Sequence, residues 1–547
     1  MEYGLDHRMP LYAGGLGILA GDILKQAHDD QLPLVGVGIL WRQGYTWQRL
    51  GANGQPYDSY PNYDEIKEWL VDTGVTVRVD VRGRPVRCRV WKTEAFGNAP
   101  LFLLDTNLPE NEDRWITGQL YGGFEEDRLA QEIVLGVGGV RALQGLGIRP
   151  DLYHFNEGHA VLAGLELIRQ KMRREEISFH RAWQLVRRQI VFTTHTPVRE
   201  GNESHRYTAL GYTGADLGFT HWQLERLGGA PFNMTVAGLR LSTLANAVSQ
   251  LHAQTARRMW QDVKEAAPIR AITNGVHLPT WQDRSIAGIP RPLDPEAVWS
   301  VHQVLKEQLI DFVADRTGTR LLPDRLLVGF GRRAAPYKRS DLIFHRPEVI
   351  DPLLAERKVQ FVFSGKAHPL DDVGKDIVAR MAEMARRYPQ AVAFLENYDM
   401  EVAARMTRGA DVWLNNPRRP LEASGTSGMK AAANGVLNLS ILDGWWPEAC
   451  QHGRNGWQFG DGYEGDGQDE RDLDALYKVL LNEVIPVYYD HPARWKQMMV
   501  NAIELAQPFS THRMLEQYYT DLYEPALREG MHAGPIPENQ LAGSQHE

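Results

Sequence analysis

The sequence predicts an α/β protein whose two lobes are built on parallel sheets and face each other across a cleft. Short apolar runs alternate with segments whose apolar residues recur at helical spacing, a pattern typical of parallel strands joined by helical crossovers. A proline-rich connector at residues 289–295 interrupts this alternation, which begins again at Leu326. The chain has 547 residues, more than one hydrophobic core uses. We therefore expect two α/β lobes followed by a C-terminal helical segment.

Eight apolar or β-branched runs are expected to form strands. They are residues 34–40, 151–155, 190–193, 326–330, 360–363, 392–395, 411–414 and 436–439. Residues 159–169 and 376–387 carry apolar stripes at helical spacing and are expected to be helices. In open α/β sheets the chemistry lies beyond the carboxyl ends of the strands, so motifs that directly follow strands deserve the closest reading.

Four segments are expected along the chain. Residues 1–275 form the N-terminal lobe and residues 276–480 the C-terminal lobe, while residues 481–529 form C-terminal helices. The tail, residues 530–547, is rich in Gly, Pro and Gln and is expected to be disordered. Within the first lobe, residues near 75–91 alternate polar and apolar about an Arg-Gly-Arg-Pro turn, which predicts an inserted antiparallel hairpin.

Composition excludes several classes of protein. Sixty Lys and Arg against 69 Asp and Glu give a net charge of −9, whereas a nucleic-acid binder is expected to be basic. The two cysteines, Cys88 and Cys450, are too few for a disulfide framework, so a reducing, cytoplasmic location is expected. No apolar run approaches the ~18 residues of a membrane span, and the first ten residues lack a signal-peptide pattern. We expect a cytoplasmic enzyme that binds neither nucleic acid nor membrane.

The strongest motif is LEASGTSGMK at residues 421–430, which follows the expected strand 411–414. A helix that starts near Thr426 would direct the backbone N–H groups of this Ser- and Gly-rich stretch at one point, a geometry that binds phosphate. Lys430 would then lie one turn into the helix, beside the anion. The spacing differs from that of a nucleotide P-loop. An N-capped helix with a surface lysine is the alternative interpretation.

A second motif, GFGRRAAPYKR at residues 329–339, directly follows the expected strand 326–330. Four of its residues are cations: Arg332, Arg333, Lys338 and Arg339. Arginine can bind two oxygens of an anion at once and lysine adds a point charge, so the motif predicts a clamp for a multiply charged anion. A solvated basic loop is the alternative.

A third motif, YAGGLG at residues 12–17, lets the backbone approach a ligand closely, but it lacks the preceding strand of a dinucleotide fingerprint. Two further strand ends carry polar residues, FNEGH at 155–159 and TTHTP at 193–197. His159 and His195 are either site residues or core histidines with satisfied hydrogen bonds. No HExxH or CxxC pattern suggests a metal site.

In this order, from Tyr12 to about Trp446, the motifs resemble those of the glycogen and α-glucan phosphorylases. The resemblance implies a GT-B fold, in which two Rossmann-like lobes face a deep cleft, and a retaining glucosyltransferase that uses pyridoxal 5′-phosphate. It points to Lys430 as the lysine that carries this cofactor as a Schiff base. The family often has Gly-Asn where Ser427 and Gly428 stand here, a change that keeps the backbone donors.

The resemblance also implies roles for other residues. Arg333 and Lys338 look like the pair that holds substrate and cofactor phosphates together, and Tyr337 is similar to the tyrosine that reaches the glucose 2-hydroxyl. Asn274 resembles the asparagine that binds the glucose 6-hydroxyl, and His195 resembles the histidine that faces the same glucose. The implied catalytic set is Lys430, Arg333, Lys338, His195 and Glu422. The implied cofactor set is Lys430, Lys338, Tyr398, Thr426, Ser427, Gly15 and Arg332. The implied substrate set is Gly15, Leu16, Asn274, Tyr337, Ser424, Gly425, Glu157 and His159, with Glu422, Ser424 and Gly425 on the 3-hydroxyl.

The implied reaction is phosphorolysis of glycogen, starch or maltodextrin by inorganic phosphate, which releases α-D-glucose 1-phosphate. The cofactor phosphate would serve as acid–base partner of the substrate phosphate, so no hydrolase-like carboxylate pair is needed. Two alternatives stay open: a nucleotide-sugar-dependent transferase of the glycogen synthase kind, and a non-catalytic glucan-binding relative. A homo-oligomer is also open.

Only eleven residues precede Tyr12, whereas family members usually carry a longer stretch there. The first lobe is therefore expected to be incomplete at its start. We expect a glycine-rich loop without its usual support to be mobile, and a chain that binds pyridoxal phosphate but turns over poorly and tends to aggregate.

Overall fold

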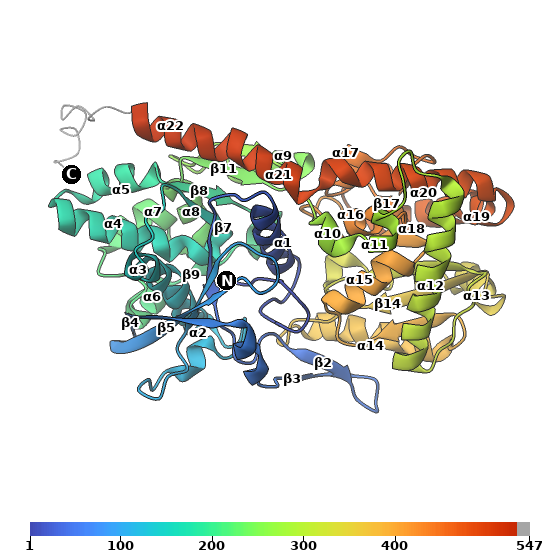
Figure 1. Ribbon diagram of the computed structural model, residues 1–547, viewed down its shortest axis with the longest axis horizontal. Helices are drawn as coiled ribbons and strands as arrows, with labels where there is room; N and C mark the ends of the chain where they lie inside the picture. Colours follow the sequence, from blue (N-terminus) through green and yellow to red (C-terminus); the bar gives the residue numbers. More distant parts are fainter. Residues whose placement is uncertain (533–547) are drawn as a thin grey trace.

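The computed structural model describes residues 1–532 and shows two lobes that lie side by side (Figure 1). The α/β fold class and the two-lobed architecture predicted from the sequence are confirmed. Most of the predicted disordered tail, 530–547, lies outside the described residues. Residues 530–532 belong to the last helix, α22 (Glu524–His532), where the structure shows helix instead.

The first lobe contains two four-stranded sheets. In the mixed sheet, ordered β1-β6-β5-β4, β1 (Gly36–Ile39) is parallel to β6 (Leu101–Asp105) and the other pairs are antiparallel. The expected hairpin is β4 (Val71–Val81) and β5 (Arg84–Thr93), and it forms half of this sheet because β5 pairs with β6. The other sheet is parallel, with the order β12-β11-β8-β7. Its strands are β7 (Tyr153–Asn156), β8 (Ile190–Thr193), β11 (Leu244–Ala247) and β12 (Ile269–Ala271).

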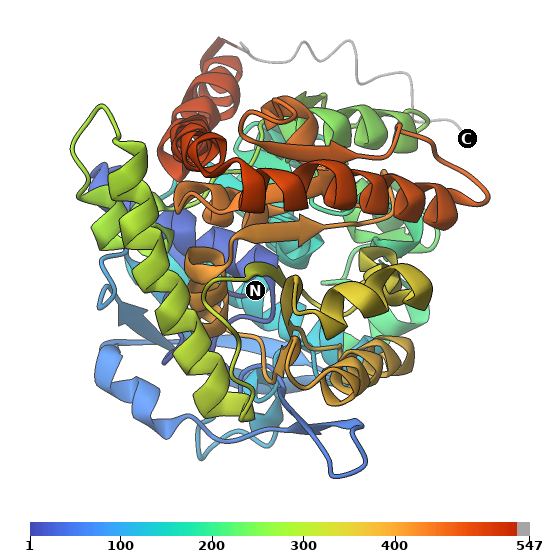
Figure 2. The ribbon, with the colours of Figure 1, turned by 90° about the vertical axis from the view of Figure 1, so that its right-hand side faces the viewer.

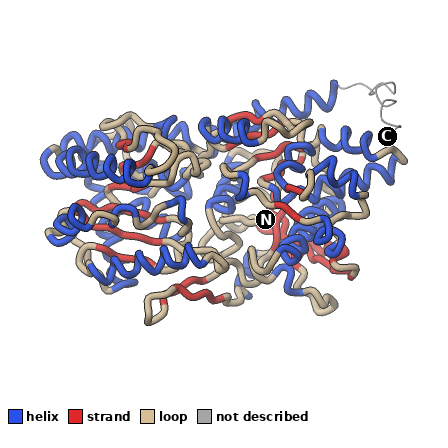
Figure 3. Tube along the Cα trace, turned by 180° about the vertical axis from the view of Figure 1, so that it is seen from behind, coloured by secondary structure: helices blue, strands red, loops and turns tan. Residues whose placement is uncertain are grey.

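The second lobe is built on one parallel sheet with the order β15-β14-β13-β16-β17-β18. Figure 3 shows these strands between layers of helices. The chain moves outward from β13 to β15 on one side and from β16 to β18 on the other, so the strand order reverses between β13 and β16. Such a reversal opens a crevice at the carboxyl ends of the strands. The strands are β13 (Leu326–Gly331), β14 (Val359–Ser364), β15 (Val392–Leu395), β16 (Val412–Asn415), β17 (Leu437–Ile441) and β18 (Gly456–Phe459).

Sequence chemistry explains where the main helices begin and end. The long helix α12 (Pro295–Thr317) lies on the outside of the second lobe (Figure 2). The carboxylate of Asp294 accepts from the backbone N–H groups of its first turn, and Gly318 ends it with a φ of 74°. The expected helices are α4 (Val161–Glu175) and α14 (Asp372–Arg387), with Asp371 as the N-cap of α14. No helix in the described part of the chain is both long and apolar enough to cross a bilayer.

The C-terminal helices are shared between the two lobes. α20 (Pro492–Ala506) buries Trp495 in the core of the second lobe. α21 (Thr511–Tyr518) and α22 instead cover the first lobe (Figure 1), where Tyr518 and Leu522 join its core. Residues 481–529 were expected to form one C-terminal helical segment. In the structure this segment divides near Phe509, because its apolar residues pack on two separate cores.

A candidate active site between the lobes

One cavity of about 1530 Å³ lies between the two lobes and is lined by both. Every residue that the sequence analysis placed in the site lines this cavity. These residues are Gly15, Leu16, Glu157, His159, His195, Asn274, Arg332, Arg333, Tyr337, Lys338, Tyr398, Glu422, Ser424, Gly425, Thr426, Ser427 and Lys430. The three motifs and the two polar strand ends therefore converge on one space.

The sheet topology of the second lobe explains this convergence. β13 ends at Gly331, so Arg332 and Arg333 emerge at the point where the strand order reverses. β16 ends at Asn415 beside it, and the chain then runs through Glu422 into helix α16 (Thr426–Ala433). The cationic motif and the Ser- and Gly-rich motif thus face one crevice, although about ninety residues separate them along the chain.

Two buried cations are held by one carboxylate at the cavity wall. The Nζ of Lys338 donates to Oε2 of Glu422 at 2.5 Å, and the guanidinium of Arg332 donates to the same oxygen. Burial would raise the pKa of the Glu422 carboxyl, but the charges of Arg332 and Lys338 outweigh it and lower the pKa to about 2. The resemblance placed Glu422 on a sugar hydroxyl; in the structure its carboxylate fixes the two cations.

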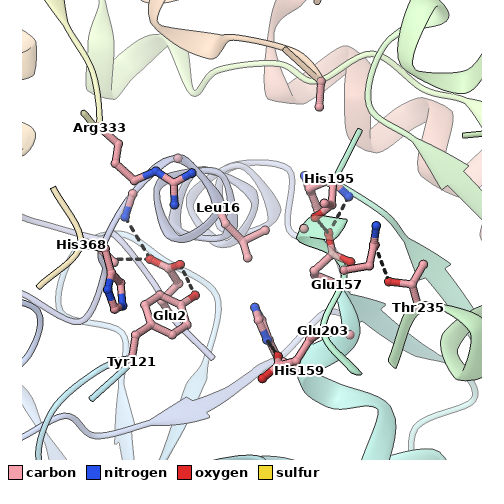
Figure 4. A pocket seen from close by; sticks show the side chains of 18 of the residues that line it. Glu2, Leu16, Tyr121, Glu157, His159, His195, Glu203, Thr235, Arg333 and His368 are labelled. Carbon is pink, nitrogen blue, oxygen red and sulfur yellow. Dashed lines mark hydrogen bonds and ion pairs between the residues drawn. The ribbon is translucent and has the colours of Figure 1, made fainter. Parts of the chain in front are cut away.

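Arg333 is different because its side chain is exposed to the cavity. It forms no hydrogen bond or ion pair with any residue that the structure describes. Figure 4 shows it beside His368, across the cavity from Glu157 and His195. A guanidinium without a protein partner at the crevice is free to bind two oxygens of an incoming anion.

Helix α16 begins at the cavity wall. Gly425 precedes it with a φ of 85°, a left-handed conformation that favours glycine. The hydroxyl of Ser427 accepts from the indole nitrogen of Trp413 at 3.1 Å, so its side chain serves the packing of the helix. Lys430 lies on the second turn, only 6% exposed, with Nζ 3.6 Å from the centroid of the Trp281 ring. Burial lowers the pKa of this amine to about 8, against the opposing charge of Asp22.

These residues fit a group that carries both an aldehyde and a phosphate. Lys430 supplies a buried amine with a lowered pKa, and the start of α16 supplies backbone donors. Several residues of the cavity wall have a buried polar atom without a hydrogen-bond partner within the described part of the chain, among them Nη1 of Arg332, Oγ of Ser424 and Oδ1 of Asn274. Buried polar atoms normally have partners, so these are available to a ligand.

The glycine-rich loop is fixed from an unexpected direction. The Glu2 carboxylate accepts from the backbone N–H groups of Ala13 and Gly14 at 2.5 and 3.2 Å, and from the Tyr121 hydroxyl at 2.6 Å (Figure 4). The N–H of Gly4 donates to the carbonyl of Gly17 at 2.7 Å. The expectation that this loop lacks support is therefore wrong for this chain, because Glu2 and Gly4 are hydrogen-bonded to both ends of it.

The two polar strand ends of the first lobe form a separate hydrogen-bonded group. The Glu157 carboxylate accepts from the His195 backbone N–H at 2.7 Å, and Nε2 of His195 lies 2.6 Å from Oδ1 of Asn156. Burial lowers the pKa of His195 to about 3, so its imidazole is neutral. His195 can therefore exchange hydrogen bonds with a sugar but cannot act as a cation.

Near His159, an arginine takes the place that a metal ion would need. Glu132, His159 and Glu203 offer ligand atoms within 4.8 Å of one another. The Arg128 guanidinium lies among them, 3.0 Å from Nδ1 of His159 and 3.2 Å from Oε1 of Glu203. We assign no metal to this cluster, because its carboxylates already hold a cation.

Sequence reasoning missed several residues of the cavity. They include Glu2, Tyr45, Tyr121, Arg128, Trp281, Lys366 and His368. Most of them lie in loops or inside helices, away from the strand ends on which the sequence argument relied. Trp281 follows the Asn-Gly-Val segment 274–276 by five residues, and Lys366 and His368 follow the expected strand 360–363, so proximity to predicted features could have indicated these three.

Two Rossmann-like lobes that face a shared cavity, with arginine and lysine side chains in its wall, form the fold of the GT-B glycosyltransferases. The model of the carbohydrate phosphorylase family matches residues 295–457. A maltodextrin phosphorylase of Thermococcus litoralis is 38% identical over 96% of this chain and 70% of its own length. Glycogen phosphorylases of Aquifex aeolicus and Mycobacterium tuberculosis are 38% and 37% identical over 96% of this chain, and over 86% and 70% of their own lengths. The chain belongs to the carbohydrate phosphorylase family and is an enzyme of the glycosyltransferase class.

Proposed function

We propose that the chain is an α-1,4-glucan phosphorylase, which cleaves glycogen, starch or maltodextrin with inorganic phosphate and releases α-D-glucose 1-phosphate with retention. The observation that carries this proposal is the free guanidinium of Arg333, which faces a cavity already containing the Arg332–Lys338–Glu422 group and the buried amine of Lys430. The relatives described above are phosphorylases of maltodextrin or glycogen, which favours phosphorolysis over the nucleotide-sugar alternative.

The proposal includes pyridoxal 5′-phosphate, the cofactor that the resemblance to the phosphorylases implies. Lys430 would hold it covalently, Tyr398 would contact it, and Lys338 with the backbone N–H groups of Thr426 and Ser427 would face its phosphate. When bound, this cofactor supplies a phosphate group that can exchange a proton with a second phosphate. The proposed reaction does not use the pyridine ring of the cofactor as an electron sink, so the site needs no residue that pairs with the ring nitrogen.

The residues of the chain have distinct tasks in this reaction. Arg333 binds and orients inorganic phosphate, whose charge must be compensated when it leaves water. Arg332 and Lys338 are held in place by Glu422 before any anion arrives, so no side chain has to reorganise at the moment of reaction. The negative charge gathered there stabilises positive charge that develops on the anomeric carbon.

The first lobe is proposed to hold the sugar. His195, with its neutral imidazole, and Asn274, with its unpartnered Oδ1, line the cavity and are proposed to form hydrogen bonds with sugar hydroxyls. Contacts between the lobes help to exclude water, which would otherwise compete with phosphate. One such contact joins the amide of Gln48, on β2 (Trp47–Leu50), to the carbonyl of Ala367 at 3.3 Å.

The proposal is tested with the purified chain saturated with pyridoxal phosphate. Maltodextrin plus inorganic phosphate should yield glucose 1-phosphate, detected by coupling to a phosphoglucomutase and a dehydrogenase. A parallel reaction with nucleotide-glucose donors and maltodextrin should transfer no glucose. Transfer from a nucleotide sugar without phosphorolysis would establish the alternative transferase, and binding of glucan without either reaction would establish the non-catalytic relative.

A further inference from the structure

The amine of Lys430 packs on the indole ring of Trp281, and this ring is hydrogen-bonded to the buried carboxylate of Asp22. The Nζ of Lys430 lies 3.6 Å from the centroid of the Trp281 indole. The indole N–H of Trp281 points to both oxygens of Asp22, at 2.9 and 3.1 Å. Asp22 and Trp281 are each 1% exposed. The ammonium, the ring and the carboxylate therefore form a continuous buried group, and of the three residues only Asp22 does not line the cavity.

This group joins three separate parts of the fold. Asp22 lies on α1 (Gly15–Asp29), the helix that starts in the glycine-rich loop. Trp281 ends α10 (Leu278–Trp281), directly after the chain leaves the first lobe. The carbonyl of Trp281 accepts from Nδ2 of Asn434 at 3.0 Å, and Asn434 is the C-cap of the helix that carries Lys430. Trp281 is thus fixed at two points: its indole N–H is bonded to the first lobe, and its backbone carbonyl is bonded to the second lobe.

We propose that Asp22 is a positioning residue for the cofactor lysine, which acts through Trp281 to fix the location of the Lys430 amine and to retain its charge. This inference rests on the proposed function. A carboxylate bonded to the indole N–H makes the ring face more negative and so strengthens its attraction for an ammonium group. Asp22 does not face the cavity and is not expected to touch substrate or cofactor.

The charges around Asp22 agree with this role. Burial raises the pKa of its carboxyl, opposed by Lys430, by the backbone N–H and the ring of His277, and by Lys25 on the same helix. The His277 backbone N–H donates to it at 3.0 Å. Burial lowers the pKa of Lys430 to about 8, and Asp22 is the charge that opposes this shift. Loss of the Asp22 charge should therefore make the amine neutral at a lower pH.

The test measures how fast the cofactor-free chain captures added pyridoxal phosphate at Lys430 as a function of pH. Only the neutral amine attacks the aldehyde, and one water leaves as the link forms, so the rate follows deprotonation of Lys430. The wild-type rate should rise with a midpoint near pH 8. Asp22→Asn should shift this midpoint down by half a pH unit or more, which makes capture at pH 7 about threefold faster relative to its plateau. An unchanged midpoint would overturn the proposal.

A matched control lies on the same helix. The Asp29 carboxylate is hydrogen-bonded to Nε2 of His277 at 2.9 Å but does not contact Trp281. Asp29→Asn should therefore keep the wild-type midpoint. If Asp29→Asn moves the midpoint as far as Asp22→Asn does, the effect is one of general charge and the specific role of Asp22 is contradicted.

A second variant keeps the proposal testable if Asp22→Asn does not fold, as checked by circular dichroism. Trp281→Phe retains a ring but lacks the N–H that Asp22 accepts, so the capture rate at the high-pH plateau should fall about threefold or more. An unchanged plateau would contradict the positioning role. Phosphorolysis by the wild-type chain is measured on the same preparation. Its absence would contradict the proposed function alone, whereas an unchanged midpoint in Asp22→Asn would contradict only this inference.

Discussion

The Nζ of Lys338 lies 2.5 Å from the carboxylate of Glu422, and Arg332 donates to the same oxygen. Of the cations in the GFGRRAAPYKR motif that line the cavity, these two are held by the protein, whereas Arg333 has no partner among the described residues. The cations of this motif therefore have two different tasks, although the sequence predicted a single anion clamp. Two cations define a fixed positive wall, and the third remains available to bind the anion.

Replacing Glu422 should destabilise the fold, and the loss should depend on pH. The pKa of this carboxyl is lowered from 4.5 to about 2, so its stabilising contribution is complete above pH 4.5 and is lost as the pH falls toward 2. Glu422→Gln leaves two buried cations unpaired, and we expect it to lose about 3 kcal/mol of unfolding free energy at neutral pH. Urea denaturation at several pH values measures the difference.

The difference between wild type and Glu422→Gln should shrink as the pH falls from 4.5 toward 2. A suitable control is Asp461→Asn, which removes an exposed ion pair with Arg471 and should change stability little at any pH. A Glu422→Gln difference that stays constant across this range would show that the carboxylate is not paired as described.

Replacing Arg333 by lysine should impair the use of phosphate without affecting the cofactor. The variant keeps a positive charge but cannot bind two oxygens at once. We expect an apparent KM for phosphate raised about tenfold and a lower kcat, with pyridoxal content near the wild-type level. Initial rates at varied phosphate concentration give both constants. Arg284→Lys, a change at an exposed arginine outside the cavity, is the control. Wild-type phosphate dependence in Arg333→Lys would reduce Arg333 to a surface cation.

Replacing Glu2 by alanine should loosen the glycine-rich loop. The variant removes the acceptor of the Ala13 and Gly14 N–H groups, and a displacement of ~1 Å at a reacting site can cost on the order of a hundredfold in rate. We expect a tenfold or larger loss of kcat/KM together with faster amide hydrogen exchange over residues 13–17. Glu65→Ala, at an exposed position, should alter neither. Unchanged exchange in Glu2→Ala would show that other contacts suffice to hold the loop.

The sequence predicted most of the strands of the two parallel sheets. All eight expected runs contain a strand, with ends that move by a few residues. β6 (Leu-Phe-Leu-Leu-Asp), β11 (Leu-Ala-Asn-Ala) and β18 (Gly-Trp-Gln-Phe) were not predicted. β11 and β18 lack β-branched residues, which are enriched in strands, whereas β6 is a buried apolar run that was overlooked.

The candidate site was predictable as far as short motifs reach. A few consecutive residues were enough to indicate the chemistry of the Ser- and Gly-rich turn, of the cationic loop and of the polar strand ends. Glu2, Asp22 and Trp281 do not, because their roles arise from contacts with residues far along the chain. The division of the C-terminal helices between two cores was unpredictable for the same reason. The apolar stripe of a helix indicates that the helix packs on a core, but it does not indicate which core.

The most direct test of the whole account identifies the lysine that holds the cofactor in the active enzyme. The chain is loaded with pyridoxal phosphate, shown to release glucose 1-phosphate from maltodextrin, reduced with borohydride, digested and mapped by mass spectrometry. We predict a pyridoxyl label on Lys430, and no phosphorolysis by Lys430→Arg although it folds. A label on another lysine of the active enzyme, or full activity in Lys430→Arg, would contradict the account.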